Sequence, residues 1–339
     1  TSIENITGSA SGDDMISGNA GVNVLNGNGG SDSLFGEGGD DTLITDGLDV
    51  VLDGGEGVDT IDLSGISEGV TVDLDTNTPM PGPATETGQL TVGSNTTVLT
   101  DIENVIGTAF NDTLFGNNEL NDIDAGAGDD IVHTFAGADT VDGGDGTDTI
   151  LFSAGGAVTI DLDDNGDATA VIGGADADTI MNFENVNGST TGGDTISGNA
   201  GVNVLNGQGG DDTLDGEGGN DTLIGGTGND TLIGGEGEDT ATYADLSADI
   251  TVTDNGDGSL TVTTLTEGVD TLTGVETILD GNGDVVFTSL TASATSLSVS
   301  SATASLAIPG DGSAAVFDDG LDSAAFAASL AAADTVEIA

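Results

Sequence analysis

Apolar residues recur at every ninth position over much of this chain, and glycine and acidic residues fill the positions between them. The clearest stretch, residues 198–242, reads GNAGVNVLN, GQGGDDTLD, GEGGNDTLI, GGTGNDTLI and GGEGEDTAT. Only the eighth place of each unit is reliably apolar, and it holds Leu205, Leu214, Leu223, Leu232 and Ala241. A period of nine fits neither a helix nor a single strand. It predicts a tight turn followed by a very short strand, so that two units form one coil of a flattened solenoid with the place-eight side chains in its core.

The turn half of each unit carries its own chemistry. Glycines at the first, second and fourth places permit positive φ and let the backbone bend with its carbonyl groups pointing inward. An Asp, or once an Asn, follows at the sixth place. Carbonyl and carboxylate oxygens that converge from stacked turns are hard ligands, and calcium takes roughly six to eight of them. The turns are therefore candidate calcium sites.

These units resemble a known family. GGTGNDTLI and GGEGEDTAT are similar to the RTX (hemolysin-type) nonapeptide GGxGxDxUx, a calcium-binding β-helix repeat. The resemblance implies that the strand segments form a parallel β-roll and that calcium lies between the turns of adjacent coils. The expected fold is all-β, with tandem parallel β-rolls (an RTX β-helix solenoid) joined by β-hairpin segments. The wider resemblance is to RTX proteins of bacterial surfaces, S-layer-like proteins among them, that use type I secretion.

The repeat is interrupted, and the interruptions divide the chain. Within the first block, the unit Thr45 to Asp53 has lost its glycines and has Val50 at the sixth place, so we expect it to keep the coil through Leu52 but to bind metal poorly. The proposed divisions are β-roll blocks at 1–62, 107–151 and 189–242, a β linker or cap at 63–106, a β-hairpin linker at 152–188, a β-hairpin cap at 243–287 and a Ser/Thr/Ala-rich segment at 288–339.

A larger repeat encloses the blocks. Each opens with a lead-in of the type IENI, which occurs at residues 3–6, 102–105 and 183–186. A fourth copy at residues 275–278 leads into no nonapeptides. The chain is thus a tandem array, and we expect no catalytic domain and no enzymatic activity within it.

The segments between blocks alternate polar and apolar residues, which is typical of strands. Residues 70–74 begin the first. Hairpins are predicted around Asn165-Gly166 and Asn255-Gly256, and they would cover the open sheet edges of the rolls. Residues 76–96 contain three of the four prolines and are predicted to form an exposed loop.

The C-terminal segment differs in composition. Residues 299–308 are a candidate strand, and residues 322–333 are a candidate helix with Asp322 as its cap. Two readings stay open for this segment: an uncleaved signal for type I secretion, or an ordinary terminal β segment that serves in assembly.

Charge is the extreme feature of the composition. The chain has 61 acidic residues and no Lys or Arg, a formal net charge of −61. Such self-repulsion expands a chain unless cations neutralise it, so the charge and the calcium hypothesis support each other. With no basic residue to meet phosphate, nucleic acid and anionic membrane surfaces are excluded as partners. No cysteine is present, and no apolar run is long enough to cross a membrane.

The candidate calcium ligands are the place-six side chains and the glycines of the most regular turns. Counting ions between neighbouring turns of each block gives about eleven calcium sites per chain. The side-chain candidates are Asp14, Asn23, Asp32, Asp41, Asp59, Asp112, Asp130, Asp139, Asp148, Asp194, Asn203, Asp212, Asp221, Asp230 and Asp239. The candidate glycines are Gly39, Gly55, Gly57, Gly144, Gly146, Gly210, Gly219, Gly226, Gly228, Gly235 and Gly237.

Three other motifs have plainer interpretations. His133 is the single histidine and has no Cys or Lys to act with, so a surface or sheet-face role is expected. Residues 65–69 match G-x-S-x-G formally, but that motif needs a strand-turn-helix setting and a His base. Residues 161–166 resemble the start of an EF-hand loop, but Ile172 stands where a bidentate Glu is needed, so a hairpin turn is expected.

Two functions follow from these features. The first is a calcium-dependent structural protein of the cell exterior that folds on binding Ca²⁺ and self-associates into a surface layer, filament or matrix. The alternative is an RTX folding and export module of a larger secreted enzyme or adhesin. Both place the protein outside the cell, where calcium binds the folded turns and drives folding.

Overall fold

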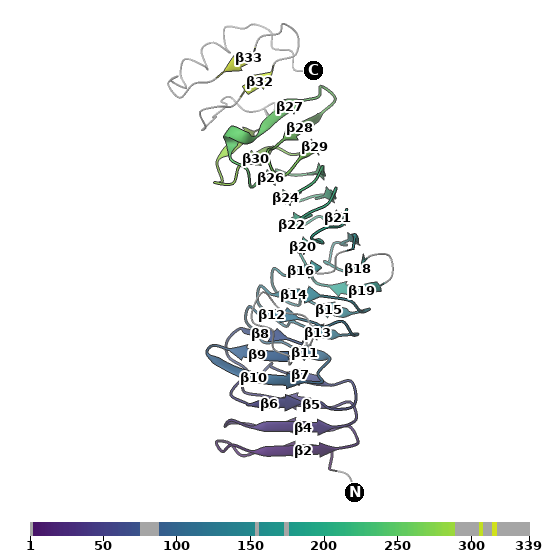
Figure 1. Ribbon diagram of the computed structural model, residues 1–339, viewed down its shortest axis with the longest axis vertical. Helices are drawn as coiled ribbons and strands as arrows, with labels where there is room; N and C mark the ends of the chain where they lie inside the picture. The colour runs from purple at the N-terminus through teal and green to yellow at the C-terminus, as the bar shows by residue number, and fades with distance from the viewer. Residues whose placement is uncertain are drawn as a thin grey trace. The chain divides into compact units, whose positions relative to one another are not determined.

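The computed structural model describes residues 3–74, 88–152, 156–172 and 176–288, together with the short strands Ser305–Ala307 and Ala314–Val316. The described chain is built from β-strands and turns, with one short 3₁₀ turn at Ser247–Asp249 (Figure 1). The described residues contain no helix that is both long and apolar enough to span a membrane. The expected all-β fold is confirmed.

The chain divides into two compact units. Unit one consists of Thr1–Ala154 and Ile160–Asn187, and unit two consists of Gly155–Thr159 and Gly188–Ala339. The boundary passes through strand β17 (Val158–Asp161). Each unit is a roll in which successive strands fall alternately in two sheets, here called sheet one and sheet two.

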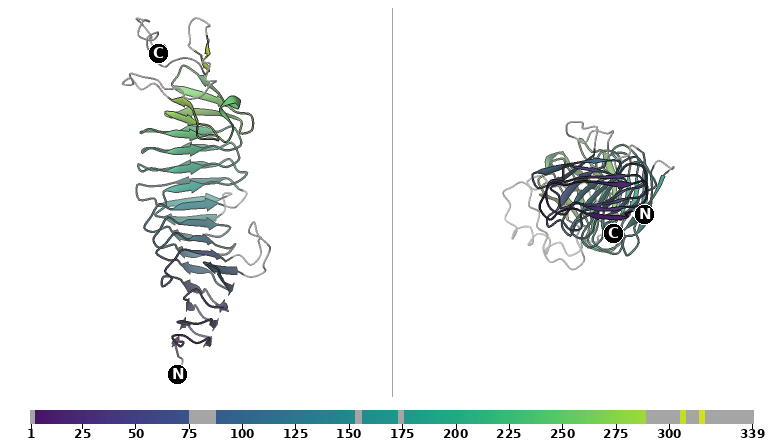
Figure 2. Two further views of the ribbon diagram at one scale, coloured as in Figure 1. Left: turned by 90° about the vertical axis from the view of Figure 1, so that its left-hand side faces the viewer. Right: turned by 90° about the horizontal axis from the view of Figure 1, so that it is seen from below.

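In unit one, both sheets stack their strands like rungs (Figure 2). Sheet one contains, in spatial order, β1 (Asn5–Thr7), β3 (Val24–Asn26), β5 (Thr42–Ile44), β7 (Thr60–Asp62), β11 (Asn104–Ile106), β13 (Asp122–Asp124), β15 (Thr140–Asp142), β19 (Asp176–Met181) and β18 (Ala168–Ile172). Sheet two contains β2 (Met15–Asn19), β4 (Ser33–Glu37), β6 (Val51–Asp53), β10 (Asn95–Thr100), β9 (Gly88–Val92), β8 (Val70–Asp73), β12 (Thr113–Phe115), β14 (Ile131–Thr134), β16 (Thr149–Phe152) and β20 (Asn185–Asn187).

Unit two repeats the plan with fewer coils. Its sheet one contains β21 (Thr195–Ser197), β23 (Thr213–Asp215), β25 (Thr231–Ile233), β29 (Val269–Thr273), β28 (Ser259–Thr263) and β27 (Thr251–Asp254). Its sheet two contains β22 (Val204–Asn206), β24 (Thr222–Ile224), β26 (Thr240–Thr242), β30 (Thr277–Leu279) and β31 (Val285–Thr288). A separate antiparallel pair is formed by β32 (Ser305–Ala307) and β33 (Ala314–Val316).

The nonapeptide period sets the register. Parallel neighbours pair residues eighteen apart, as Leu25 with Leu43 and Leu43 with Ile61. All three of these place-eight side chains have 0% exposure, and so has Leu52 in the unit without glycine at its first, second and fourth places. The thin core therefore runs through every coil, as the apolar spacing predicts.

The segments between blocks form three-stranded antiparallel meanders, longer than the predicted hairpins. In the first, β8, β9 and β10 are antiparallel, β10 pairs in parallel with β6, and β8 pairs in parallel with β12. The third, β27 to β29, is antiparallel around the predicted Asn255-Gly256 turn, and β29 pairs in parallel with β25. Each meander therefore extends a sheet and returns the chain to the roll.

One loop prediction is wrong in part. Residues 76–96 were expected to form an exposed loop, but Gly88–Val92 is strand β9, and Leu90 is completely buried. The three prolines and the turn residues nearby favoured a loop prediction. Strand β9 forms because β8 and β10 pair with it on either side. Residues 75–87 and the candidate helix at 322–333 lie outside the described residues; of the candidate strand at 299–308, the structure describes Ser305–Ala307 as strand.

Candidate calcium-binding turns

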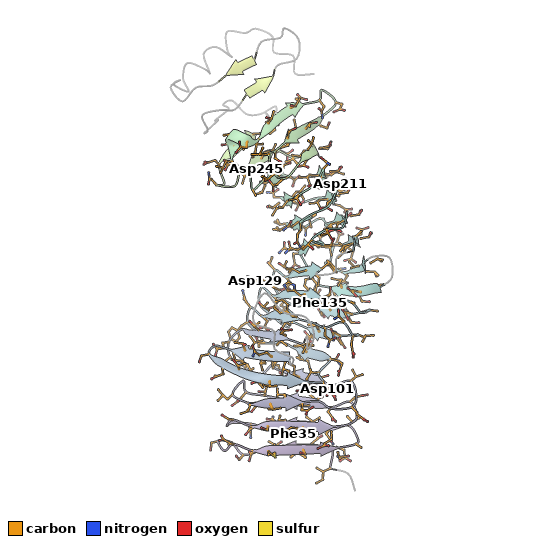
Figure 3. The ribbon with its side chains drawn as sticks, viewed as in Figure 1. Phe35, Asp101, Asp129, Phe135, Asp211 and Asp245 are labelled. Atoms are coloured by element: carbon orange, nitrogen blue, oxygen red, sulfur yellow. The ribbon has the colours of Figure 1, made fainter. Side chains whose placement is uncertain are left out.

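The turns stack into columns along the two edges of each roll. Figure 3 shows Asp101 and Asp129 at opposite edges of unit one. Within a column, each place-six side chain reaches the coil before it, because its Oδ1 accepts a hydrogen bond from the backbone N–H of the place-six residue eighteen positions earlier. Asp41 Oδ1 accepts from Asn23 at 2.7 Å, and Asp59 Oδ1 accepts from Asp41 at 2.7 Å. The same bond joins Asp130 to Asp112, Asp148 to Asp130, Asp139 to Asn121, Asp212 to Asp194, Asp221 to Asn203, Asp230 to Asp212 and Asp239 to Asp221.

The second carboxylate oxygen separates the turns into two classes. In one class, Oδ2 is buried and has no hydrogen-bond partner. The members of this class among the predicted ligands are Asp32, Asp41, Asp59, Asp130, Asp148, Asp212, Asp221, Asp230 and Asp239. We call these the open turns. A buried carboxylate oxygen without a partner is costly, so each open turn has one strong ligand atom that the protein alone does not satisfy.

In the other class, the turn satisfies its own side chain. Asp14 Oδ2 accepts from the Ser9 N–H at 2.6 Å, and Asp112 Oδ2 accepts from the Thr108 N–H at 2.7 Å. Asp194 repeats this bond with Ser189 at 2.6 Å. The amide oxygens of Asn23, Asn121 and Asn203 accept in the same way from Asn19, Asn117 and Asn199. We call these the closed turns, and they are the first two turns of each block.

The backbone at the second place explains the division. In the open turns this residue is left-handed: φ is 99° at Gly55, 94° at Gly144 and 92° at Gly226. Four open turns have a larger residue there and keep the conformation, with φ of 74° at Asn28, 75° at Glu37, 66° at Gln208 and 61° at Glu217. Left-handed φ is unfavourable for residues other than glycine. In the closed turns the donor is the second-place residue, except for Ser9 and Ser189 at the first place. None of the first- and second-place residues of these turns has positive φ, so the donor N–H faces the side-chain oxygen.

Asparagine replaces aspartate at the sixth place where the side chain must donate a hydrogen bond to a nearby carbonyl group. The Asn23 side-chain amide donates to the Ile3 carbonyl at 3.1 Å, and Asn121 donates to the Glu103 carbonyl at 2.7 Å. Both acceptors lie in lead-ins, and a carboxylate has no proton to donate. By sequence alone, all place-six side chains are equivalent candidate ligands. The structure instead commits Asp14, Asn23, Asp112, Asp194 and Asn203 to hydrogen bonds within the protein.

The predicted glycines lie where coils touch. Positive φ is found at Gly39, Gly55, Gly57, Gly144, Gly210, Gly219, Gly226, Gly228, Gly235 and Gly237. A Cβ on Gly237 would collide with the Gly219 carbonyl oxygen, and one on Gly146 would collide with the Gly128 carbonyl oxygen. Gly146 is therefore required by close approach, because its φ is not in the left-handed region. The glycines bring the carbonyl groups of consecutive turns close together.

Burial and mutual repulsion raise the pKa of several open-turn carboxyls. Burial, reinforced by neighbouring carboxylates, raises the pKa of Asp130 and Asp212 to about 7. The same causes raise the pKa of Asp59, Asp148 and Asp221 to about 6. Since the chain has no Lys or Arg, no protein cation offsets this repulsion.

Calcium fits this donor set. Calcium prefers oxygen ligands, and the open turns combine an unpartnered carboxylate oxygen with closely spaced backbone carbonyls. Among the described residues, no three acidic or histidine side chains converge in a way that holds a metal. A bound ion must therefore take most of its ligands from the turn carbonyls, with the place-six aspartates supplying the charge.

One place-six assignment is wrong. Val50 was assigned to the sixth place of its unit, but Val50 is 51% exposed. Asp49 takes the position instead: it is buried, and its Oδ1 accepts from the Asp32 N–H at 3.1 Å. The unit has a shortened turn, so counting places in a fixed frame shifted the assignment by one residue.

Five acidic residues in the columns were not predicted. The lead-in glutamates accept from the last aspartate of a column: Glu103 from Asp59 at 2.7 Å, Glu184 from Asp148 at 2.7 Å and Glu276 from Asp239 at 2.8 Å. In the meanders, Asp178 accepts from Asp139, and Asp270 accepts from Asp230. The sequence signal for the lead-in contacts is the recurrence of Glu in all four lead-ins.

The other candidate motifs occupy ordinary positions. His133 is half-buried and stacks on Phe115 with ring centroids 4.3 Å apart, and burial lowers its pKa to about 4. Residues 65–69 lie between strands β7 and β8, with no helix after them. In the loop that resembles an EF-hand, the Asp163 side chain accepts from the Asn165 and Asp167 N–H groups, which makes it a hairpin turn.

Comparison with known proteins agrees with this geometry. The model of the RTX calcium-binding nonapeptide repeat matches residues 9–43, 100–119, 115–150, 189–223 and 215–242. The chain is therefore an RTX-repeat protein, and its repeats bind calcium and form a calcium-dependent folding module. No curated protein matches the chain significantly.

Proposed function

We propose that this RTX-repeat protein is a structural protein of the cell exterior, which folds on binding calcium and self-associates into a surface layer, filament or matrix. The observation that carries the proposal is that the described chain consists of repeat coils and the meanders that join and cap them. Within each unit the described residues form stacked strands, as a structural role requires.

The mechanism is linkage between calcium and folding. Folding brings aspartates of successive coils together in buried columns, where their Oδ2 atoms have no partner. At cytosolic calcium, repulsion among 61 acidic residues opposes this arrangement. Extracellular calcium modules bind at roughly 10⁻⁴ to 10⁻³ M, so calcium outside the cell binds the folded turns and stabilises them. Secretion by a type I pathway, unfolded inside and folded outside, fits this switch.

The alternative is that the chain is the RTX folding and export module of a larger secreted enzyme or adhesin. The repeat match favours it equally, since calcium-dependent folding serves either role. The two proposals differ in what the folded chain does next.

The test measures size and shape against calcium. Light scattering and electron microscopy follow the protein from excess chelator to about 10 mM calcium, well above the affinity expected for such modules. Growth from an expanded monomer into regular filaments or sheets supports the structural role. Compaction to a stable monomer at every protein concentration overturns it and leaves the folding module.

A further inference from the structure

The hairpin turn between strands β28 and β29 stacks on a repeat turn although it is not a nonapeptide. Residues 265–270 read LTEGVD and lie outside the residues that the repeat family matches. The Gly228 N–H donates to the Glu267 carbonyl at 2.7 Å, and the Thr271 N–H donates to the Asp230 carbonyl at 2.8 Å. Consecutive repeat turns make the same two bonds, as Gly219 to Glu236 and Thr240 to Asp221, both at 2.8 Å. Residues 265–270 therefore occupy the next turn of the column above residues 225–230.

The backbone of this hairpin turn copies the fourth place of a repeat. Gly268 has φ of 118°, close to 115° at Gly219. A Cβ on Gly268 would collide with the Gly228 carbonyl oxygen, as a Cβ on Gly237 would collide with that of Gly219. The carbonyl groups of the two stacked turns are thus as close here as they are within a repeat block.

The side chain at the sixth place has an open carboxylate oxygen, although Thr266 at the second place is not left-handed, because the Thr266 N–H donates to Asp245 instead. Asp270 has 0% exposure, and its Oδ1 accepts from the Asp230 N–H at 2.8 Å. Its Oδ2 and that of Asp230 are both buried without a hydrogen-bond partner. The buried Tyr243 hydroxyl lies beside the Asp270 carboxylate and interacts with it, although neither the hydroxyl oxygen nor Asp270 Oδ2 has a partner at full hydrogen-bond geometry. The column therefore presents two unsatisfied carboxylate oxygens next to one phenol.

Two other carboxylates hold the hairpin turn in place. Asp245 Oδ2 accepts from the Leu265 N–H at 2.9 Å and from the Thr266 N–H at 2.8 Å. Glu267 Oε2 accepts from the Ala244 N–H at 2.8 Å. These bonds connect the turn to the segment that follows β26, so its position does not depend on the β28–β29 hairpin alone.

We propose that the hairpin turn at residues 265–270 and the repeat turn at residues 225–230 together bind a calcium ion. Asp230 and Asp270 supply the charge, and the carbonyls of the two turns supply the remaining oxygens. This inference rests on calcium binding by the repeats and is independent of surface assembly. The ion joins the meander β27–β29 to the last coil of unit two, so the cap docks only when calcium is present.

The first meander provides a natural contrast. Its return strand β10 has Thr97 in the position of Asp270, and the Thr97 hydroxyl donates to the Asp49 carbonyl at 2.7 Å. Thr97 is uncharged and its hydroxyl already has a hydrogen-bond partner, so this position supplies no anionic ligand for a metal ion. The meanders therefore differ in calcium requirement according to this one residue.

The test uses the single tyrosine. Tyr243 is the only Tyr, and the chain has no Trp, so terbium, which replaces calcium and emits when a nearby tyrosine is excited, reports the ions nearest to Tyr243 most strongly. The full chain should show terbium emission on tyrosine excitation, and excess calcium should abolish it. D270N should lose the larger part of the emission and bind one calcium fewer by equilibrium dialysis. D249N, which removes an exposed carboxylate of the same cap, should change neither.

The outcomes distinguish this site from calcium binding in general. Absent emission from the unmodified protein, while circular dichroism shows calcium-dependent folding, overturns the hairpin site and leaves the folding module intact. Absence of both signals overturns calcium-dependent folding itself. Undiminished emission in D270N, together with an unchanged calcium count, places the ion elsewhere and also overturns the proposal. If D270N fails to fold, Y243F decides the question, because it should abolish the emission while keeping the full calcium count.

Discussion

The closed turns that open each block and the open turns that follow them share almost everything. Both place an Asp or Asn at the sixth position, and both stack in the same columns. They differ in one backbone residue, since the open turns have a left-handed residue at the second place and the closed turns do not. In Asp194 the turn's own N–H satisfies Oδ2, whereas in Asp212 that oxygen has no partner. Whether an aspartate at the sixth place needs a metal ion is therefore decided by the orientation of the peptide near the start of the turn, and the aspartate itself is the same in both classes.

The difference implies that the closed and open turns of a block have different roles in folding. In the two closed turns, the protein itself satisfies the place-six side chains. The first coil can therefore form without a cation, and later coils can pair with it. Each later coil buries an unsatisfied carboxylate oxygen, so its addition requires calcium. Folding is expected to begin at the closed turns and to advance along the columns as ions bind.

The largest effect is expected from removing charge in the open turns. Asp221→Asn with Asp230→Asn keeps the shape of both side chains but removes two anionic ligands. Hydrogen bonds and ligand contacts to charged groups contribute roughly 1.5–3 kcal/mol each, so the calcium midpoint of folding should rise on the order of tenfold or more. Circular dichroism against calcium measures the midpoint. Asp194→Asn in a closed turn is the control and should raise the midpoint less, because it removes one protein hydrogen bond but no metal ligand; an equal shift in both variants contradicts the two classes.

Protonation should replace calcium in part. The unfolded-state pKa of Asp is about 4, whereas burial raises the folded-state pKa of Asp130 and Asp212 to about 7. The folded state therefore binds protons more tightly, so this stabilisation is fully present below about pH 4 and is lost as the pH rises through about 7. Calcium-free protein should gain strand signal in circular dichroism on acidification from pH 8 to pH 4.

A salt control separates buried carboxyls from general repulsion. About 1 M NaCl shortens the screening length to about 3 Å and weakens repulsion between exposed charges. It should restore less structure at pH 8 than acid does. Equal recovery in salt and in acid would show that surface repulsion alone opposes folding.

The lead-in glutamates should have an intermediate effect. Glu184→Ala leaves the buried Asp148 N–H without its acceptor, which should cost about 1–3 kcal/mol in the free energy of unfolding. Glu184→Gln retains an acceptor oxygen and should recover most of the loss. Chemical denaturation at saturating calcium measures both, with the exposed Glu119→Ala as a control. Identical stability of the Ala and Gln variants would exclude the hydrogen bond as the cause.

The smallest effect concerns the backbone residue that defines the two classes. Glu217 holds φ of 61° in an open turn, so Glu217→Gly should relieve left-handed strain and stabilise the calcium-bound protein by about 1 kcal/mol. Glu217→Gln removes the same charge but keeps the strain, and thermal unfolding should show no gain. In a closed turn, Asn199→Gly should instead destabilise by about 0.5–1 kcal/mol, because glycine loses more conformational entropy there. A gain at both positions would contradict the assigned conformations.

Much of this protein was determined by its sequence alone. The nine-residue period places Leu25, Leu43 and Ile61 in the core and the aspartates in the turns, because strand alternation and turn chemistry act within a few residues. Only the tertiary structure decided which turns leave an oxygen unsatisfied, since that depends on the peptide orientation at the second place. It also brought Glu184 to Asp148 and Asp270 to Asp230, which are 36 and 40 residues apart. Those contacts form only after a meander has folded back onto the roll, and no local period encodes that return.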